Sequence, residues 1–195
     1  MRWKYMEREK QYEALFLKTE ELLSVKNRVV IAIDGGAASG KTTLADLLAK
    51  RYGGEIVHMD DFFLRPEQRT PERFAEAGGN FDRERFLEEV IPFIGKKEAF
   101  SYRIFDCSKM CLFGNAEISD SALVIVEGSY SHHPAFAEAF DLRVFLRVNE
   151  EERRERIIKR NGDRSEMFFT RWIPLENRYF EAFQIEEKAD LVIRG

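Results

Sequence analysis

Residues 29–43 read VVIAIDGGAASGKTT, and this stretch decides the fold of the 195-residue chain. Its first five residues are apolar and mostly β-branched, which is typical of a strand buried on both faces of a parallel sheet. Residues 35–42 match the pattern G-x-x-x-x-G-K-[ST], and residues 40–52 place Leu44, Leu47 and Leu48 on one face of a helix. A buried strand, a glycine-rich turn and a helix in this order predict a loop that holds the phosphates of a nucleoside triphosphate.

The chemistry of this P-loop depends on its residue types. Small residues let backbone N–H groups come close to phosphate oxygens, and the following helix points its positive end at the same anion. Lys41 can bridge the β- and γ-phosphates, and the Thr42 hydroxyl can bind Mg²⁺. We therefore expect ATP and Mg²⁺ as cofactors. The expected nucleotide-binding residues of the loop are Gly35, Gly36, Ala37, Ala38, Ser39, Gly40, Lys41, Thr42 and Thr43.

The rest of the chain alternates between strand and helix patterns, which predicts an α/β fold. Further strands are expected at 55–59, 122–126, 142–148 and 189–193, and helices at 83–94, 150–160 and 166–184, where Pro174 should kink or break the last helix. Segment 61–82 reads as a loop, and segment 100–118 as a hairpin-like excursion. The expected architecture is a P-loop NTPase, a three-layer sandwich with a mainly parallel five-stranded sheet. An amphipathic helix in residues 1–27 precedes one domain, 28–195.

Acidic residues follow three of the expected strands. In an open parallel sheet, ligands bind beyond the carboxyl ends of the strands, and Asp34, Asp60 with Asp61, and Glu127 would lie there. Asp34 adjoins the P-loop turn and is interpreted as structural. Glu127 is expected to hold Mg²⁺, as a Walker B acid does. Asp60 ends a strand expected to neighbour the P-loop strand, and it is the candidate base for the attacking hydroxyl and a further metal ligand. The neighbouring Asp61 remains an alternative base.

An arginine-rich segment follows the fourth strand. Arg153, Arg156 and Arg160 are spaced to share one helix face, and Gly162 offers a hinge before Arg164. Arginine matches the geometry of phosphate and stabilises charge during phosphoryl transfer. The segment is therefore expected to be a lid, in which Arg153 and Arg164 bind the nucleotide and Arg156 and Arg160 assist catalysis. The alternative is a solvated face on which these arginines pair with the glutamates among residues 150–155.

Taken in order, the motifs resemble those of the uridine kinase-like family of P-loop kinases, which is related to phosphoribulokinase and pantothenate kinase. The resemblance covers most of residues 29–193. Besides the P-loop, it rests on Asp60-Asp61-Phe62-Phe63, Asn80-Phe81-Asp82, Phe105-Asp106, Glu127-Gly128 and the spacing of Arg153, Arg156 and Arg160.

The resemblance implies roles for individual residues. Asp60 would be the catalytic base, Asp82 a ligand of sugar hydroxyls, and Lys41, Thr42 and Glu127 the ligands of ATP and Mg²⁺. The expected substrate-binding residues are Asp60, Phe63, Asp82, Phe105 and Glu127. Phe63 and Phe105 stand where the family has tyrosines, so a second small alcohol, of the pantothenate or sugar type, remains an alternative to a nucleoside such as uridine or cytidine.

Composition narrows the classes of partner. The net charge is -4 with both signs spread along the chain, which does not favour nucleic-acid binding. No apolar run approaches the ~20 residues that cross a bilayer. Residues 1–10 lack the apolar core of a signal peptide, so a cytoplasmic location is expected. The predicted function is an ATP-dependent kinase for a small-molecule hydroxyl. A non-catalytic nucleotide-dependent switch or sensor is the alternative, and a homo-oligomer is left open.

Overall fold

The computed structural model describes residues 12–194. Helix α2 (Glu13–Val25) lies within the expected N-terminal helix, whose first residues, 1–11, fall outside the described residues. Within 12–194, no helix combines the length and the apolarity that crossing a membrane requires.

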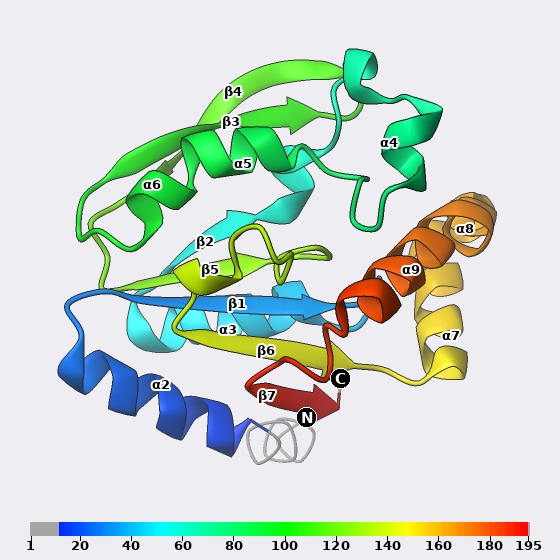
Figure 1. Ribbon diagram of the computed structural model, residues 1–195. Helices are drawn as coiled ribbons and strands as arrows, with labels where there is room; N and C mark the ends of the chain where they lie inside the picture. The colour runs from blue at the N-terminus through cyan, green and yellow to red at the C-terminus, as the bar shows by residue number, and fades with distance from the viewer. Residues whose placement is uncertain (1–11, 195) are drawn as a thin grey trace.

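A five-stranded parallel sheet forms the centre of the molecule (Figure 1). Its strands are β1 (Val29–Gly35), β2 (Glu55–His58), β5 (Leu123–Glu127), β6 (Leu142–Arg147) and β7 (Leu191–Arg194), in the order β2-β5-β1-β6-β7. The expected sheet is therefore confirmed. Strand β2 was expected to lie next to the P-loop strand β1, and this prediction was wrong. Strand β5 lies between them, and its Val126 stands opposite Ala32 of β1 and Val57 of β2. Strand β5, which is apolar up to Glu127 and buried throughout, can take this central place, since both of its faces and both of its edges are covered.

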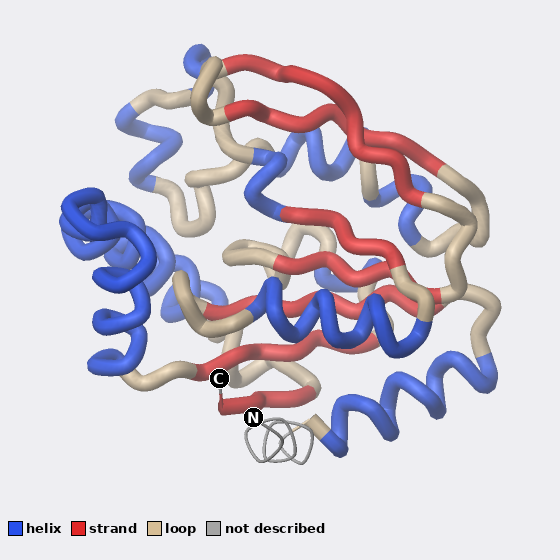
Figure 2. Tube along the Cα trace, turned by 180° about the vertical axis from the view of Figure 1, so that it is seen from behind, coloured by secondary structure: helices blue, strands red, loops and turns tan. Residues whose placement is uncertain are grey.

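Helices cover both faces of the sheet, which gives the expected three layers. Helix α3 (Lys41–Tyr52) and α2 lie on one face of the sheet (Figure 2). There Leu15, Leu44 and Leu48 belong to one buried cluster with Ile31 and Ile33. On the other face, α5 (Arg83–Glu89), α6 (Ile91–Ile94), the segment after β5 and α9 (Ile173–Phe183) enclose a core rich in aromatic side chains. The inward and outward alternation along β1 divides its side chains between the two cores.

The segments between the strands form small structures of their own. The expected excursion is an antiparallel hairpin of β3 (Phe100–Asp106) and β4 (Cys111–Ile118). Segment 61–82, expected to be a loop, also contains the helix α4 (Pro71–Ala75) and a 3₁₀ turn at Pro66–Gln68; another 3₁₀ turn, Met59–Phe62, follows β2, and one at Ala137–Ala139 precedes β6. In Figure 1, α4 lies toward the carboxyl end of the sheet, and the hairpin runs lengthwise beyond the β2 edge of the sheet.

The last helical region is continuous but changes its winding. It comprises α7 (Glu150–Asn161), a 3₁₀ turn at Gly162–Arg164, α8 (Ser165–Met167), a π-helical turn at Phe168–Trp172 and α9. Pro174 was expected to kink or break this helix. The α-helix is indeed interrupted directly before it, by the π-helical turn, and Pro174 lies in the first turn of α9, a position that proline tolerates.

Candidate active site

The P-loop joins the carboxyl end of β1 to the amino end of α3. Gly35 and Gly40 have φ angles of +146° and +100°, which residues with a side chain rarely adopt. A Cβ at Gly35 would also lie 2.5 Å from the Leu146 carbonyl oxygen. The glycines of the motif therefore fix the path of the loop. The N-terminus of α3 begins at Lys41 and directs its partial positive charge toward this turn.

The Lys41 ammonium group lies over the loop itself. Its Nζ donates hydrogen bonds to the carbonyl oxygens of Gly35 and Gly36, at 2.8 and 3.0 Å. Lys41 also lines a cavity of about 530 Å³ that opens at the carboxyl end of the sheet. An ammonium group held in this way can bind the phosphate oxygens of a ligand in the cavity.

Thr42, Glu127 and His58 meet at one side of the loop. The Thr42 Oγ1 lies 3.3 Å from both carboxylate oxygens of Glu127, and His58 Nδ1 lies 2.7 Å from Glu127 Oε1. This hydrogen bond to Glu127 raises the pKa of His58. Sequence reasoning did not single out His58, and the short strand that ends at His58 gave no signal for a partner 69 residues away.

The donor set fits a hydrated magnesium ion. Hydroxyl and carboxylate oxygens are the ligands that Mg²⁺ prefers, and the ion usually keeps several waters and phosphate oxygens. Thr42 and Glu127 supply such oxygens side by side, and Asp60 lines the same cavity. Within residues 12–194, no three His, Cys, Asp or Glu side chains gather as a metal site. The protein would therefore hold the ion together with the nucleotide.

The two adjacent aspartates have different surroundings. Asp60, in the turn after β2, lines the cavity, where water reaches it although protein atoms enclose it on most sides. This enclosure raises the pKa of Asp60 against the opposing charge of Lys41. The Asp61 carboxylate accepts a hydrogen bond of 3.0 Å from Tyr102 Oη and does not line the cavity.

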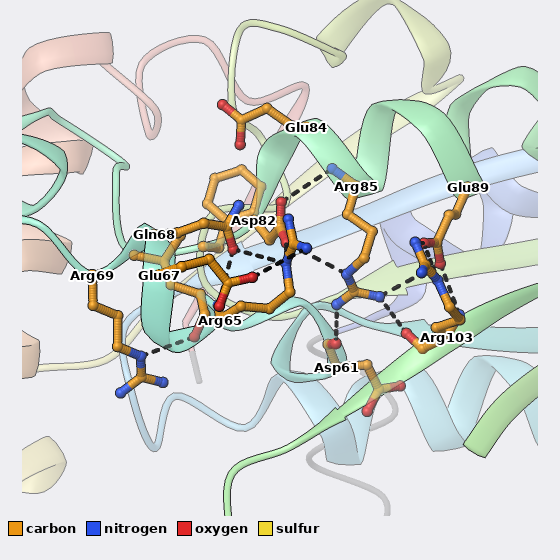
Figure 3. Close-up of polar contacts among 12 residues, drawn as sticks. Asp61, Arg65, Glu67, Gln68, Arg69, Asp82, Glu84, Arg85, Glu89 and Arg103 are labelled. Atoms are coloured by element: carbon orange, nitrogen blue, oxygen red, sulfur yellow. Dashed lines mark hydrogen bonds and ion pairs between the residues drawn. The ribbon is translucent and has the colours of Figure 1, made fainter. Parts of the chain in front are cut away.

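Two of the expected substrate ligands do not reach the cavity. The Asp82 carboxylate is fully buried, caps α5 through the Arg85 N–H, and lies between the guanidinium groups of Arg65 and Arg85 (Figure 3). Phe105 is 3% exposed and lies beneath the Arg69 guanidinium. Asp82 and Phe105 thus do not line this cavity, because helix capping engages the first and core packing the second, and the substrate contact that the resemblance implies for them stays a prediction.

Further residues, several of them aromatic, line the same cavity. Phe63 lines it as expected, and Phe81 stacks on Tyr130 with ring centroids 5.5 Å apart. Sequence reasoning did not assign Phe168, Trp172 and Glu176 to the site. Their spacing of four residues, which places them on one helix face, was the signal that could have identified them. Besides the P-loop, Glu127 and the lid arginines, the cavity is lined by Met59, Asp60, Phe63, Asn80, Phe81, Gly128, Ser129, Tyr130, Phe168, Trp172 and Glu176.

The expected lid arginines divide into two groups. Arg156 and Arg160 line the cavity, and Arg156 Nη1 donates to the Ala38 carbonyl oxygen at 3.2 Å. Arg156 also pairs with Glu152 one helical turn away, so the solvated-face alternative applies to it in part. Arg153 lies at the edge of the P-loop, where it pairs with Glu176. Arg164 is exposed and outside the cavity, since the 3₁₀ turn carries it away from the loop.

Asp34 lies beneath the P-loop, and its contacts agree with the interpretation that it has a structural role. Its buried carboxylate accepts hydrogen bonds from Gly35 N, His132 N and Tyr179 Oη at 2.7, 3.0 and 2.8 Å. Asp34 thereby joins the loop, the segment after β5 and α9 at one point. Among the loop residues, Gly35, Gly36 and Ser39 lie below the cavity lining, whereas Ala37, Ala38, Gly40, Lys41, Thr42 and Thr43 form part of it.

The known proteins that this chain resembles are described as kinases. No protein-family model matches the chain. A candidate uridine kinase of Schizosaccharomyces pombe is 30% identical over 179 residues, which cover 77% of this chain and 73% of that protein. A bifunctional α-galactosidase/sucrose kinase of Mediterraneibacter gnavus is 30% identical over 182 residues, 81% of this chain but 19% of the relative. The solved structure of a possible uridine kinase from Bacillus stearothermophilus has 23% identity and a TM-score of 0.72, over 95% of this chain and 98% of that one, and shares its fold.

Proposed function

This chain belongs to the uridine kinase-like family of P-loop kinases, and from that premise we propose that it transfers the γ-phosphate of ATP to a hydroxyl group of a small molecule, most favourably a nucleoside of the uridine or cytidine type. One observation carries the proposal. A single cavity is lined by Lys41, Thr42 and other P-loop residues and also by a carboxylate, Asp60, and several aromatic side chains. Donor and acceptor of a phosphoryl group can therefore meet within it.

In the proposed reaction, the residues act mainly by positioning and by charge. The P-loop amides and Lys41 bind the phosphates, and Arg156 and Arg160 stabilise the negative charge that develops on the transferred group. Thr42 and Glu127, with Asp60, would hold Mg²⁺, which neutralises phosphate charge when it is bound. Asp60 accepts the proton of the acceptor hydroxyl. That oxygen forms a bond to the γ-phosphorus, the bond from phosphorus to the β–γ bridging oxygen breaks, and ADP leaves.

Aromatic side chains support a nucleoside as the acceptor. Phe63, Phe168 and Trp172 line the same cavity as the P-loop and offer flat apolar faces. Such faces suit a nucleobase or the apolar face of a sugar ring. The name of the Mediterraneibacter gnavus relative includes a sucrose kinase, so a sugar is the second candidate acceptor.

An acceptor-dependent ATPase assay tests this proposal. The chain is incubated with Mg-ATP and, separately, uridine, cytidine, pantothenate, fructose or sucrose, and both ADP and phosphorylated product are measured. We expect ADP and a phosphorylated nucleoside in equal amounts. A phosphorylated sugar or pantothenate alone would keep the kinase and reject the nucleoside. ATP binding without product from any acceptor would favour a nucleotide-dependent switch over a kinase.

A further inference from the structure

A carboxylate from outside the P-loop takes up one of the loop's backbone donors. The Ala37 N–H donates to Glu176 Oε2 at 3.0 Å, and Ser129 Oγ donates to Glu176 Oε1 at 2.7 Å. Glu176 comes from the first turn of α9 and is 5% exposed. The P-loop binds phosphate through N–H groups of this kind. In this structure, the Glu176 carboxylate therefore lies where an anionic ligand of the loop would be expected.

Arg153 connects the same carboxylate to the lid helix α7. Its guanidinium group pairs with Glu176 Oε2, and its side chain is 11% exposed. The guanidinium also rests against Gly36, where an added Cβ would lie 2.7 Å from Arg153 Cζ. The motif G-x-x-x-x-G does not require a glycine at this position, so Gly36 permits the close approach of Arg153.

Two polar groups beside this pair have no partner among the described residues. They are Arg153 Nε and Ser39 Oγ, both buried. Buried polar groups are nearly always hydrogen-bonded in folded proteins. The contacts of Arg153 with Glu176 and Gly36 therefore leave Arg153 Nε without a hydrogen bond among the described residues.

A triphosphate that enters the loop would meet the negative charge of Glu176. A phosphate group and the Glu176 carboxylate are both anions that use the Ala37 N–H, and both attract the Arg153 guanidinium. They cannot occupy the same donors together. Arg153 is close enough to the loop to pair with phosphate as soon as the carboxylate leaves.

We propose that Glu176 competes with the phosphates of ATP for the P-loop and for Arg153. In the free protein, the Arg153–Glu176 pair holds α7 and α9 together at the loop. Nucleotide binding exchanges this pair for an Arg153–phosphate pair and releases the Glu176 carboxylate into the cavity that it lines. This inference rests on the proposed function, because ATP must be the ligand of the loop.

Calorimetry with Mg-ATP and no acceptor tests the competition on the full chain. Glu176→Gln keeps a side-chain oxygen for Ala37 but removes the charge that opposes phosphate and holds Arg153. We expect the Kd for ATP to fall about tenfold, since net hydrogen-bond energies to charged groups are of that order. Glu181→Gln makes the same charge change at an exposed position of α9 and should leave the Kd unchanged.

A second pair of variants tests the same competition if Glu176→Gln folds poorly. Ser129→Ala removes one donor to Glu176 and should also tighten ATP binding, by a smaller factor. Arg153→Gln should weaken it, and in that background Glu176→Gln should gain less than in the wild type. If the wild type binds ATP and neither Glu176→Gln nor Ser129→Ala binds it more tightly, the proposed competition is wrong but the proposed function stands. A wild type that binds no ATP would overturn the proposed function and the competition with it.

Discussion

At the scale of the residue, Asp60 and Asp61 show how adjacent carboxylates come to have different chemistry. Strand β2 ends at His58 and a 3₁₀ turn begins at Met59, so the two side chains leave the backbone in different directions. Asp60 lines the cavity, while Asp61 accepts a hydrogen bond from Tyr102. The sequence pattern could not show which of the two faces the cavity, because this depends on where the strand ends and on Tyr102 of the hairpin, 41 residues away.

The first prediction compares these two carboxylates. Asp60→Asn should lower kcat by about 10²–10⁴, the usual contribution of a positioned base, with little change in ATP affinity. Asp61→Asn should cost much less, since Asp61 does not line the cavity. Steady-state kinetics with the true acceptor measure both. If Asp61→Asn is the crippling change, the base has been assigned to the wrong carboxylate, and if both changes are mild, Asp60 is not a base.

The second prediction concerns Lys41. Lys41→Ala should raise the Kd for Mg-ATP at least about tenfold or abolish turnover, because charge-assisted hydrogen bonds to the phosphates are lost. The fold should remain intact, which circular dichroism can verify. Lys50→Ala, on the exposed side of the same helix α3, is the matched control and should behave as the wild type. Unchanged affinity together with unchanged turnover in Lys41→Ala would reject the P-loop as the nucleotide site.

At the scale of the element, the sequence predicted the kinds of segment better than their neighbours. Short β-branched runs predict strands wherever they occur, and all five strands were found near the expected positions. Strand order depends on contacts between distant segments, so the place of β5 between β1 and β2 carried no local signal. The same reason explains Glu176, whose partner Ala37 lies 139 residues away.

The third prediction concerns the arginine-rich lid. Ile157 is the only residue of α7 that is buried, so the helix is held mainly by polar contacts at its cavity side. Segment 150–165 should therefore exchange its amide hydrogens quickly without ligand and more slowly with Mg-ATP, when the arginines bind phosphate. Hydrogen exchange measures this, with the fully buried β1 as an internal reference protected in both states. Equal, strong protection of 150–165 in both states would contradict a lid.

At the scale of the whole molecule, one buried arginine ties the hairpin to the sheet. Arg28, 5% exposed, donates Nε to the Ser121 carbonyl oxygen at 2.9 Å and Nη1 to that of Glu98 at 3.0 Å. It also donates to the carbonyl oxygens of Lys96 and Ser119. These carbonyls lie just before β3 and just after β4, so both ends of the hairpin converge on the start of β1. Sequence reasoning gave Arg28 no role, because a lone arginine before a strand has many other uses.

The fourth prediction follows from this convergence. Arg28→Met keeps an unbranched side chain of similar length but leaves four carbonyl oxygens without their donor, and unsatisfied buried groups cost about 1–3 kcal/mol each before they find water. We expect the free energy of unfolding in urea to fall by about 3 kcal/mol. Arg147→Met removes an exposed arginine that pairs with Glu186, and it should cost about 1 kcal/mol at most. ATP affinity should be unchanged in folded Arg28→Met, since Arg28 precedes β1 and the P-loop follows the opposite end of that strand. Equal losses of stability in the two variants would show that the hairpin is held by its apolar contacts and not by Arg28.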